Sequence, residues 1–308
     1  MLRIPNWLKK IIGAREADIE LDAKRSSFYN LVSADTAIER VATGFQFTEG
    51  PVWYEEDKYL LFSDIPAGKI LKLISNGQVR TYREPSNNSN GLTRDREGRL
   101  IVCEHGTRRV TRTEKDGSNN ILADKFQGRK LNSPNDVVVK SDGAIYFTDP
   151  PYGIQPGHKE QPVRGVYRLS ADQGILTLLV DDFRGPNGLA FSPDEGRLYI
   201  NDSECRHVRA FDVQPDGSLS NGQIFHDMNI DKPGAPDGMK VDVSGNVYCA
   251  GPGGVWVLDP EGRHLGTIVT PEQPTNCAWG DDDWQSLYIT AQTSVYRIRT
   301  NIPGVKAS

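Results

Sequence analysis

One short phrase recurs six times along the chain and constrains its fold more than any other feature. In each copy a side chain that carries an oxygen atom stands beside Gly, Pro or Thr and opens a run of residues typical of a β-strand. The six positions are Glu49, Asn90, Asn135, Asn187, Asp237 and Asn276. Successive positions are 41, 45, 52, 50 and 39 residues apart. A period of about 40–50 residues built from short strands indicates a β-propeller, in which each repeat forms one four-stranded blade.

The rest of each repeat predicts the same architecture. A turn and a second apolar strand follow each phrase, as at residues 60–64, 100–104 and 145–149, and several repeats show a third strand. The chain contains 30 Gly and 19 Pro, which favours many turns over long helices. We therefore predict an all-β fold, a six-bladed β-propeller over residues 37–308 that closes as a single unit.

Residues 1–36 lie outside the repeats and form a predicted N-terminal extension. Residues 5–12 have the pattern of a short helix with Trp7, Leu8, Ile11 and Ile12 on one side, which we expect to pack on the propeller as a cap. Residues 37–47 read as a strand that enters the first repeat and closes the ring by completing the last blade.

Because equivalent positions of a ring of blades point toward one axis, the six side chains should converge at one end of the central channel. All six carry oxygen, and Glu49 and Asp237 are carboxylates, so the ring suits a hard divalent cation, Ca²⁺ before Mg²⁺. The alternative is that Asn and Asp recur because they form good turns before strands. It accounts for Asn90 and Asn276 but not for a glutamate in the first repeat.

Charge and cysteine content exclude several classes of function. The net charge is -5 with no basic stripe, so we expect no nucleic-acid partner. No apolar run approaches the length of about 18 residues that a membrane span needs. The four cysteines fall in different repeats without a CxxC pair, and residues 1–36 lack the features of a secretory signal. We therefore expect a cytoplasmic protein.

Three of the phrases resemble the signatures of a known family. EGPVW at residues 49–53, PNGLA at 186–190 and PDGM at 236–239 are similar to phrases of the gluconolactonase, regucalcin (senescence marker protein) and luciferin-regenerating-enzyme family. The resemblance covers roughly residues 40 to 300 by the repeat criterion. CEHG at 103–106 and TDPPYG at 148–153 resemble the bacterial gluconolactonases in particular.

The resemblance implies a metal-dependent hydrolysis of a sugar lactone, with D-glucono-1,5-lactone converted to D-gluconate. It implies one divalent ion, usually Ca²⁺ with Mg²⁺, Mn²⁺ or Zn²⁺ as alternatives, held by Glu49, Asn187 and Asp237 and in several members also by Asn135. The ion would polarise the lactone carbonyl, while Asp237 or a metal-bound water handles the proton. In the vertebrate branch an Arg that contacts substrate stands where this chain has Ser133, so the sugar contacts do not transfer.

Further residues near the same end of the channel complete the predicted site. His105 is a second candidate for the general base, with a purely structural role as its alternative. The insert over residues 150–164 brings Tyr152 to the border of the pocket. The residues expected to contact substrate are Asn135, Ser133, Glu104, Asp149, Tyr152 and Asp202. For Asp149 and Asp202 the alternative is a buried acid that binds backbone amides.

Two other functions remain open from the sequence. One is a related lactonase, esterase or phosphotriesterase that acts on a different substrate. The other is a calcium-binding propeller without catalysis, because fold alone does not imply function. The retained carboxylates and amides of the ring favour an enzyme over such a scaffold.

Overall fold

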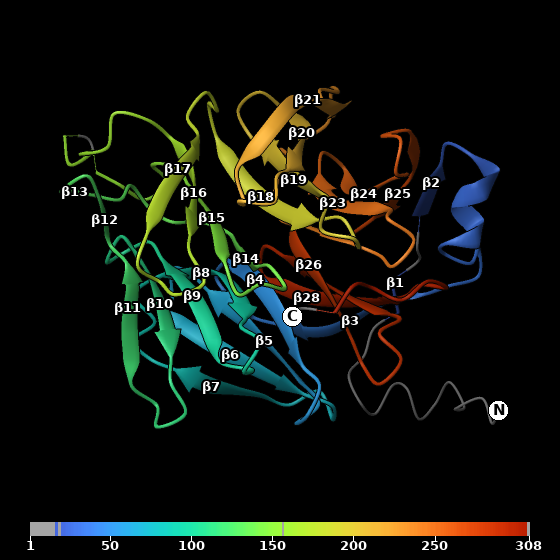
Figure 1. The fold of residues 1–308 in the computed structure, drawn as a ribbon. Coiled ribbons are helices and arrows are strands. Elements are labelled where there is room, and N and C mark those ends of the chain that lie inside the picture. Colours follow the sequence, from blue (N-terminus) through green and yellow to red (C-terminus); the bar gives the residue numbers. More distant parts are fainter. Residues whose placement is uncertain (1–15, 18–19, 156, 307–308) are drawn as a thin grey trace.

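The computed structural model describes residues 16–17, 20–155 and 157–306. In this part of the chain six antiparallel sheets of four or five strands are arranged in a ring (Figure 1). The predicted six-bladed β-propeller is therefore confirmed. The helix predicted over residues 5–12 lies outside the described residues. No helix in the described part of the chain is long and apolar enough to cross a membrane.

Blades 1 to 5 each contain four successive strands, blade 6 contains three, and in every blade the first of these strands is the innermost. The inner strands of neighbouring blades contact one another around the channel. Blades 1 to 3 are β4 (Thr48–Tyr54), β5 (Tyr59–Asp64), β6 (Lys69–Ile74) and β7 (Val79–Arg83); β8 (Ser89–Arg94), β9 (Leu100–Glu104), β10 (Arg109–Thr113) and β11 (Asn119–Ala123); β14 (Val137–Val139), β15 (Ile145–Asp149), β16 (Gly165–Leu169) and β17 (Leu176–Val180). Blade 4 is β18 (Pro186–Phe191), β19 (Arg197–Asp202), β20 (His207–Val213) and β21 (Leu219–Asp227).

Blades 5 and 6 each gain a strand or more from the N-terminal part of the chain. Blade 5 is β22 (Met239–Val241), β23 (Val247–Gly251), β24 (Gly254–Leu258), β25 (His264–Val269) and β2 (Glu20–Ala23). Blade 6 is β26 (Pro274–Gly280), β27 (Ser286–Ala291), β28 (Ser294–Arg299), β3 (Ile38–Thr43) and β1 (Glu16–Ala17). The pairing of β3 with β28 runs from Thr43 opposite Ser294 to Glu39 opposite Arg297. The prediction that residues 37–47 complete the last blade is thereby confirmed.

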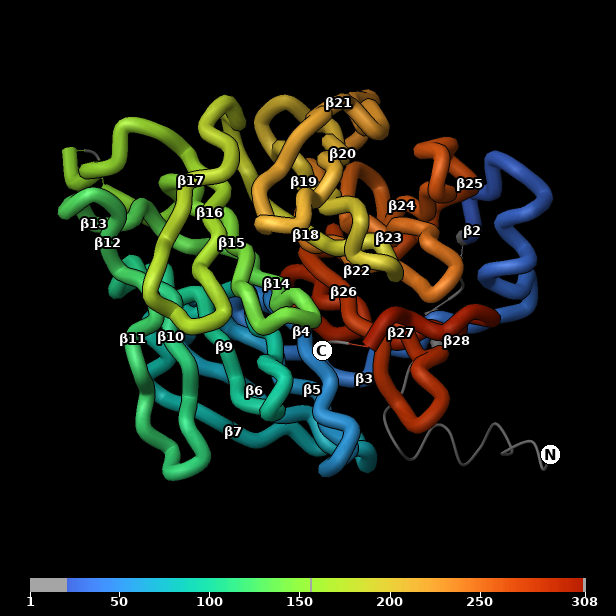
Figure 2. Tube along the Cα trace, in the orientation of Figure 1, coloured from blue at the N-terminus to red at the C-terminus, as the bar shows by residue number. Residues whose placement is uncertain are grey.

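A 3₁₀ helix, η1 (Ser26–Asn30), connects β2 to the strand that closes the ring and lies beside β25 (Figure 2). Its Phe28 is fully buried against Gly266 of β25, where a Cβ atom would lie 2.7 Å from Phe28 Cγ. Only a glycine leaves room for the ring at this point, so Gly266 fixes where the segment docks. A small hairpin, β12 (Lys125–Phe126) and β13 (Arg129–Lys130), follows blade 2.

The core fills the wedges between neighbouring blades, because each blade packs on a neighbour at both of its faces. The strands β4, β5, β26 and β27 are buried along their whole length, whereas the outer strand β7 is largely exposed. Trp53 of β4 stacks on Tyr288 of β27 with ring centroids 5.6 Å apart. This aromatic pair joins the first blade to the last and holds the channel wall in place.

Candidate metal and active site

The recurring phrases converge at one end of the channel, as their symmetry predicts. A cavity of about 440 Å³ opens there between the starts of the inner strands, and five of the six ring positions line it. These five are Glu49, Asn90, Asn135, Asn187 and Asp237. The sixth, Asn276, lies beneath the lining, and its Nδ2 donates a hydrogen bond to Glu49 Oε2 at 3.0 Å.

Glycines that follow the ring positions allow this convergence. A Cβ atom on Gly91 would lie 2.5 Å from the backbone oxygen of Asn135 in the next blade, and one on Gly188 would collide with the backbone oxygen of Asp237. The Gly91 nitrogen also donates a hydrogen bond to the Asn135 oxygen at 2.8 Å. The glycine in the phrase thus lets one blade touch the ring residue of its neighbour.

The two carboxylates of the cavity come from blades on either side of blade 6. Glu49 is 4% exposed, and Asp237 keeps an opening to the cavity. Burial raises the pKa of both side chains, the charge of Asp136 raises the pKa of Glu49 further, and that of Glu49 raises the pKa of Asp237. The charged forms of both side chains are thus disfavoured, and a bound cation would stabilise them.

The donor set of the cavity fits a hard divalent ion. Glu49 and Asp237 contribute carboxylate oxygens, and Asn135 and Asn187 contribute amides, so the site offers oxygen ligands and no sulfur. Within residues 16–17, 20–155 and 157–306, no three His, Cys, Asp or Glu side chains gather into a metal-binding group. Amide oxygens would therefore have to complete any coordination shell around the carboxylate pair.

His105 and Tyr152 line the same cavity. His105 Nε2 lies 3.1 Å from Asn90 Nδ2, and burial lowers the pKa of the imidazole to about 4. The side chain is therefore neutral at neutral pH, and because the Asn90 amide donates to Nε2, its proton is on Nδ1. Burial raises the pKa of Tyr152 to about 12, so its hydroxyl keeps its proton and is a donor.

Four other residues expected to contact substrate do not line the cavity. The Ser133 hydroxyl is buried without a hydrogen-bond partner among the described residues. The Glu104 carboxylate faces Arg83 and Arg109. Asp149 Oδ2 accepts a hydrogen bond from the backbone amide of Asn132 at 2.7 Å. Burial raises the pKa of Asp149 to about 7. The fourth, Asp202, is described below.

Asp202 shows what the acids at the ends of the second strands do. Its two oxygens accept hydrogen bonds from the backbone amides of Arg184 at 2.7 Å and Gly185 at 2.9 Å, just before Asn187. Burial alone would raise its pKa, but these and neighbouring amides outweigh that effect and lower it. Asp149 holds the loop before Asn135 in the same way. Both acids therefore position ring residues through the backbone.

Sequence reasoning missed part of the cavity wall, although a positional signal was present. Ile65, Ser203 and Gln292 line the cavity and directly follow the second strand of their blades, as His105 does. Ser203 Oγ accepts a hydrogen bond from Asn187 Nδ2 at 3.0 Å. The residue after the second strand is thus a second ring position. Phe47 and Gln273 also line the cavity, and no repeat marks them.

The fold and the site together define a six-bladed propeller with a carboxylate and amide site at the end of its channel. The model of the family described as SMP-30/Gluconolactonase/LRE-like region matches residues 47–293, and the chain belongs to this family. The chain is 34% identical over 301 residues to the gluconolactonase of Zymomonas mobilis, a match that covers 89% of this chain and 84% of that protein.

Two further relatives match a similarly large part of the chain. The pentonolactonase of Haloferax volcanii is 30% identical over 264 residues, which cover 83% of this chain and 84% of that protein. The solved structure of a gluconolactonase from Xanthomonas campestris has a TM-score of 0.86 and 33% identity, and the match covers 93% of this chain and 97% of that one. The similarity therefore extends over the whole propeller.

Proposed function

We propose that the protein is a metal-dependent hydrolase of sugar lactones and that D-glucono-1,5-lactone is its substrate. The observation that carries the proposal is the pair of carboxylates, Glu49 and Asp237, that line one cavity at the end of the channel among amide side chains. A propeller that served only as a scaffold and bound no ion would need closed blades but no pair of carboxylates in its channel. Membership of a family that includes gluconolactonases and a pentonolactonase supports the lactone as substrate class.

The charge of the cavity favours an uncharged substrate. Among the described residues that line it, none is lysine or arginine, and its two acids would be balanced by one divalent ion. A phosphate or carboxylate group on the substrate would find no cationic side chain there. The amides of Asn90, Asn135, Gln273 and Gln292 can instead hydrogen-bond to the hydroxyl groups of a sugar ring.

The protein's own side chains supply positioning and proton transfer. A divalent ion held by Glu49, Asn135, Asn187 and Asp237 would supply Lewis-acid polarisation of the lactone carbonyl. Asp237, whose carboxylate has two oxygens, accepts the proton of the attacking water. His105 and Tyr152 border the substrate at the cavity wall, and neutral His105 accepts a hydrogen bond from Asn90 and so orients that amide toward the ring hydroxyls.

The first experiment measures hydrolysis of D-glucono-1,5-lactone by the purified protein, corrected for spontaneous ring opening. The protein is treated with EDTA, and Ca²⁺, Mg²⁺, Mn²⁺ or Zn²⁺ is restored singly. We expect activity to disappear with EDTA and to return with one of these ions, Ca²⁺ first. Asp237→Asn should lower kcat by roughly 100-fold or more, since general-base catalysis contributes about that much. Asp216→Asn, in an exposed turn where Asp216 accepts from Ser218, is the control and should leave kcat unchanged.

Turnover that survives both EDTA and Asp237→Asn would refute this mechanism. Binding of the ion without turnover of any lactone would instead support a calcium-binding scaffold. Parallel assays with pentono-1,4-lactones and an organophosphate test the neighbouring activities. The lactone of 6-phosphogluconate tests the charge argument, because its kcat/KM should be at least about 100-fold below that of the uncharged lactone for want of a phosphate partner. Equal values would contradict it.

A further inference from the structure

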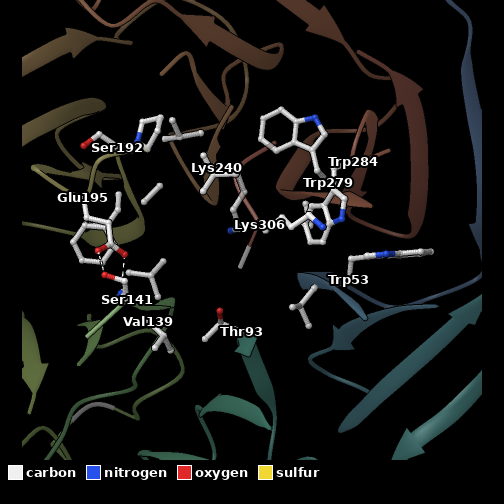
Figure 3. A pocket seen from close by; sticks show the side chains of 18 of the residues that line it. Trp53, Thr93, Val139, Ser141, Ser192, Glu195, Lys240, Trp279, Trp284 and Lys306 are labelled. Carbon is white, nitrogen blue, oxygen red and sulfur yellow. Dashed lines mark hydrogen bonds between the residues drawn. The ribbon is translucent and has the colours of Figure 1, made fainter. Parts of the chain in front are cut away.

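The channel opens into a second cavity at its other end, which Figure 3 shows. The cavity has a volume of about 390 Å³ and is lined by the later residues of the inner strands, such as Trp53 of β4, Lys240 of β22 and Trp279 of β26. The ring positions stand at or before the starts of the same strands. A residue in this lining therefore reaches the proposed metal site only through the channel.

Lys240 is the residue that makes this connection. It follows Asp237 by three positions, and its stem lines the far cavity. Its ammonium group points back into the channel, where Nζ donates to the Met239 oxygen at 3.0 Å and lies 3.4 Å from Asn276 Oδ1. Asn276 in turn donates from Nδ2 to Glu49 Oε2 at 3.0 Å. A chain of contacts thus runs from Lys240 through Asn276 to a carboxylate of the site.

The channel carries more negative charge than one divalent ion offsets. Besides Glu49 and Asp237, a third acid interacts electrostatically with both: Asp136, which is 3% exposed and lies one residue after Asn135. Asp136 Oδ1 accepts a hydrogen bond from the Val137 backbone amide at 2.9 Å. Lys240 is the cationic side chain whose contacts reach this group, because its partner Asn276 is hydrogen-bonded directly to Glu49.

We propose that Lys240 is a positioning residue and an internal counterion of the metal site. Its ammonium group and the Cys277 backbone amide, which donates to Asn276 Oδ1 at 2.8 Å, together hold the Asn276 amide with the NH₂ group toward Glu49. Its charge offsets one of three carboxylates and leaves two for a divalent ion. Lys240 thereby weakens the binding of the ion and stabilises the metal-free protein. This inference rests on the metal site that is part of the proposed function.

The test compares the full-length protein with Lys240→Met and Lys240→Gln. Ca²⁺ binding is measured by calorimetry on EDTA-treated protein, and the unfolding temperature is measured with and without Ca²⁺. We expect both variants to bind Ca²⁺ roughly tenfold more tightly or better, because a positive charge near the ion is removed from a region of low dielectric. The unfolding temperature should fall more without Ca²⁺ than with it, since three carboxylates then repel one another without compensation.

Lys306→Met is the matched control. Lys306 lines the same far cavity, but its ammonium group pairs with Glu55 at 2.8 Å at the rim. This variant should leave the dissociation constant of Ca²⁺ unchanged. Lys240→Gln, which keeps a hydrogen-bonding group near Asn276, separates charge from geometry: equal effects in both variants assign the change to charge.

Several outcomes would overturn the inference. A dissociation constant within twofold of the wild type in both variants, weaker binding in both, or an equal loss of thermal stability with and without Ca²⁺ would show that Lys240 only fills space. If the wild-type protein binds none of the four ions, the metal site itself is refuted, and the inference fails with it. If the wild-type protein binds Ca²⁺ and both variants bind it with the same affinity, this inference is refuted but the metal site is not.

Discussion

Replacing Glu104 with glutamine removes one buried charge and keeps the shape of the side chain. The Glu104 carboxylate is fully buried and accepts hydrogen bonds from Arg83, from Arg109 Nε at 2.7 Å and from Thr111 Oγ1 at 3.0 Å. Burial alone would raise its pKa, but these donors and Thr107 outweigh burial and lower it. In the variant, the NH₂ group of glutamine would face donors where the carboxylate accepted.

The size of the effect follows from this environment. Removal of one partner of a buried ion pair costs about 3–5 kcal/mol. Arg109 is 25% exposed and can turn toward water, which favours the lower figure of about 3 kcal/mol. An unfolding entropy of about 2.1 cal/mol/K per residue converts this loss, for 308 residues, to a fall in Tm of about 5 °C.

The assay is thermal unfolding followed by circular dichroism, with Glu97→Gln as control. Glu97 is 59% exposed and pairs with Arg99 at 2.8 Å, so its replacement should change Tm by about 1 °C or less. Because the folded-state pKa of Glu104 is lowered, its contribution is present above the unfolded-state pKa near 4.5 and is lost as pH falls further. The gap between wild type and Glu104→Gln should therefore narrow below pH of about 4. A Tm within 1 °C of the wild type at pH 7 would refute the reasoning.

Three further predictions follow from the packing. Gly188→Ala should weaken Ca²⁺ binding by at least about tenfold in calorimetry, because the added Cβ displaces the backbone of Asp237; unchanged affinity would contradict the role of that glycine. Phe28→Ala should lower Tm by roughly 5 °C or more through a loss of about 3–5 kcal/mol, with kcat at 25 °C unchanged, and an unaltered Tm would show that the segment does not stabilise blade 5. Burial and the neighbouring His226 lower the pKa of His264 to about 4 in the folded protein. The unfolded chain therefore binds a proton at this residue first, and the stability decreases as the pH is lowered from about 6.5 to 4. His264→Phe should flatten that part of the curve of Tm against pH, and an identical curve would assign the acid loss to other groups.

The sequence predicts the fold well because the repeat itself carries the information. One oxygen-bearing position in each repeat, such as Glu49 or Asn187, fixes the number of blades and the end of the channel where these side chains meet. Closure by residues 37–47 was also predictable, since an unpaired strand before the first repeat needs a partner. The docking of Phe28 against Gly266 has no such signal, because it depends on a single close contact in one blade.

The site was predicted less completely because residue type and position in the repeat do not fix the direction in which a side chain points. Asn276 occupies a ring position but turns its NH₂ group toward Glu49, because its Oδ1 accepts hydrogen bonds from the Cys277 backbone amide at 2.8 Å and from Lys240 Nζ at 3.4 Å. Glu104 stands beside His105, yet only His105 lines the cavity, because successive residues at a strand end point to opposite sides. Whether an acid such as Asp202 contacts substrate or backbone depends on a loop that periodicity does not describe.

The closure of blade 6 gives the chain a property that the other blades do not reveal. Its strands β3 and β28 come from the two ends of the propeller, and its Asn276 lies between Glu49 of blade 1 and Asp237 of blade 5. Any ligand that bridges these two carboxylates therefore spans the seam of the ring and acts as a clasp on it. Occupancy of the site and opening of the seam are then linked equilibria. Ligand binding should therefore slow amide hydrogen exchange more along β3 and β28 than along the strands of the other blades.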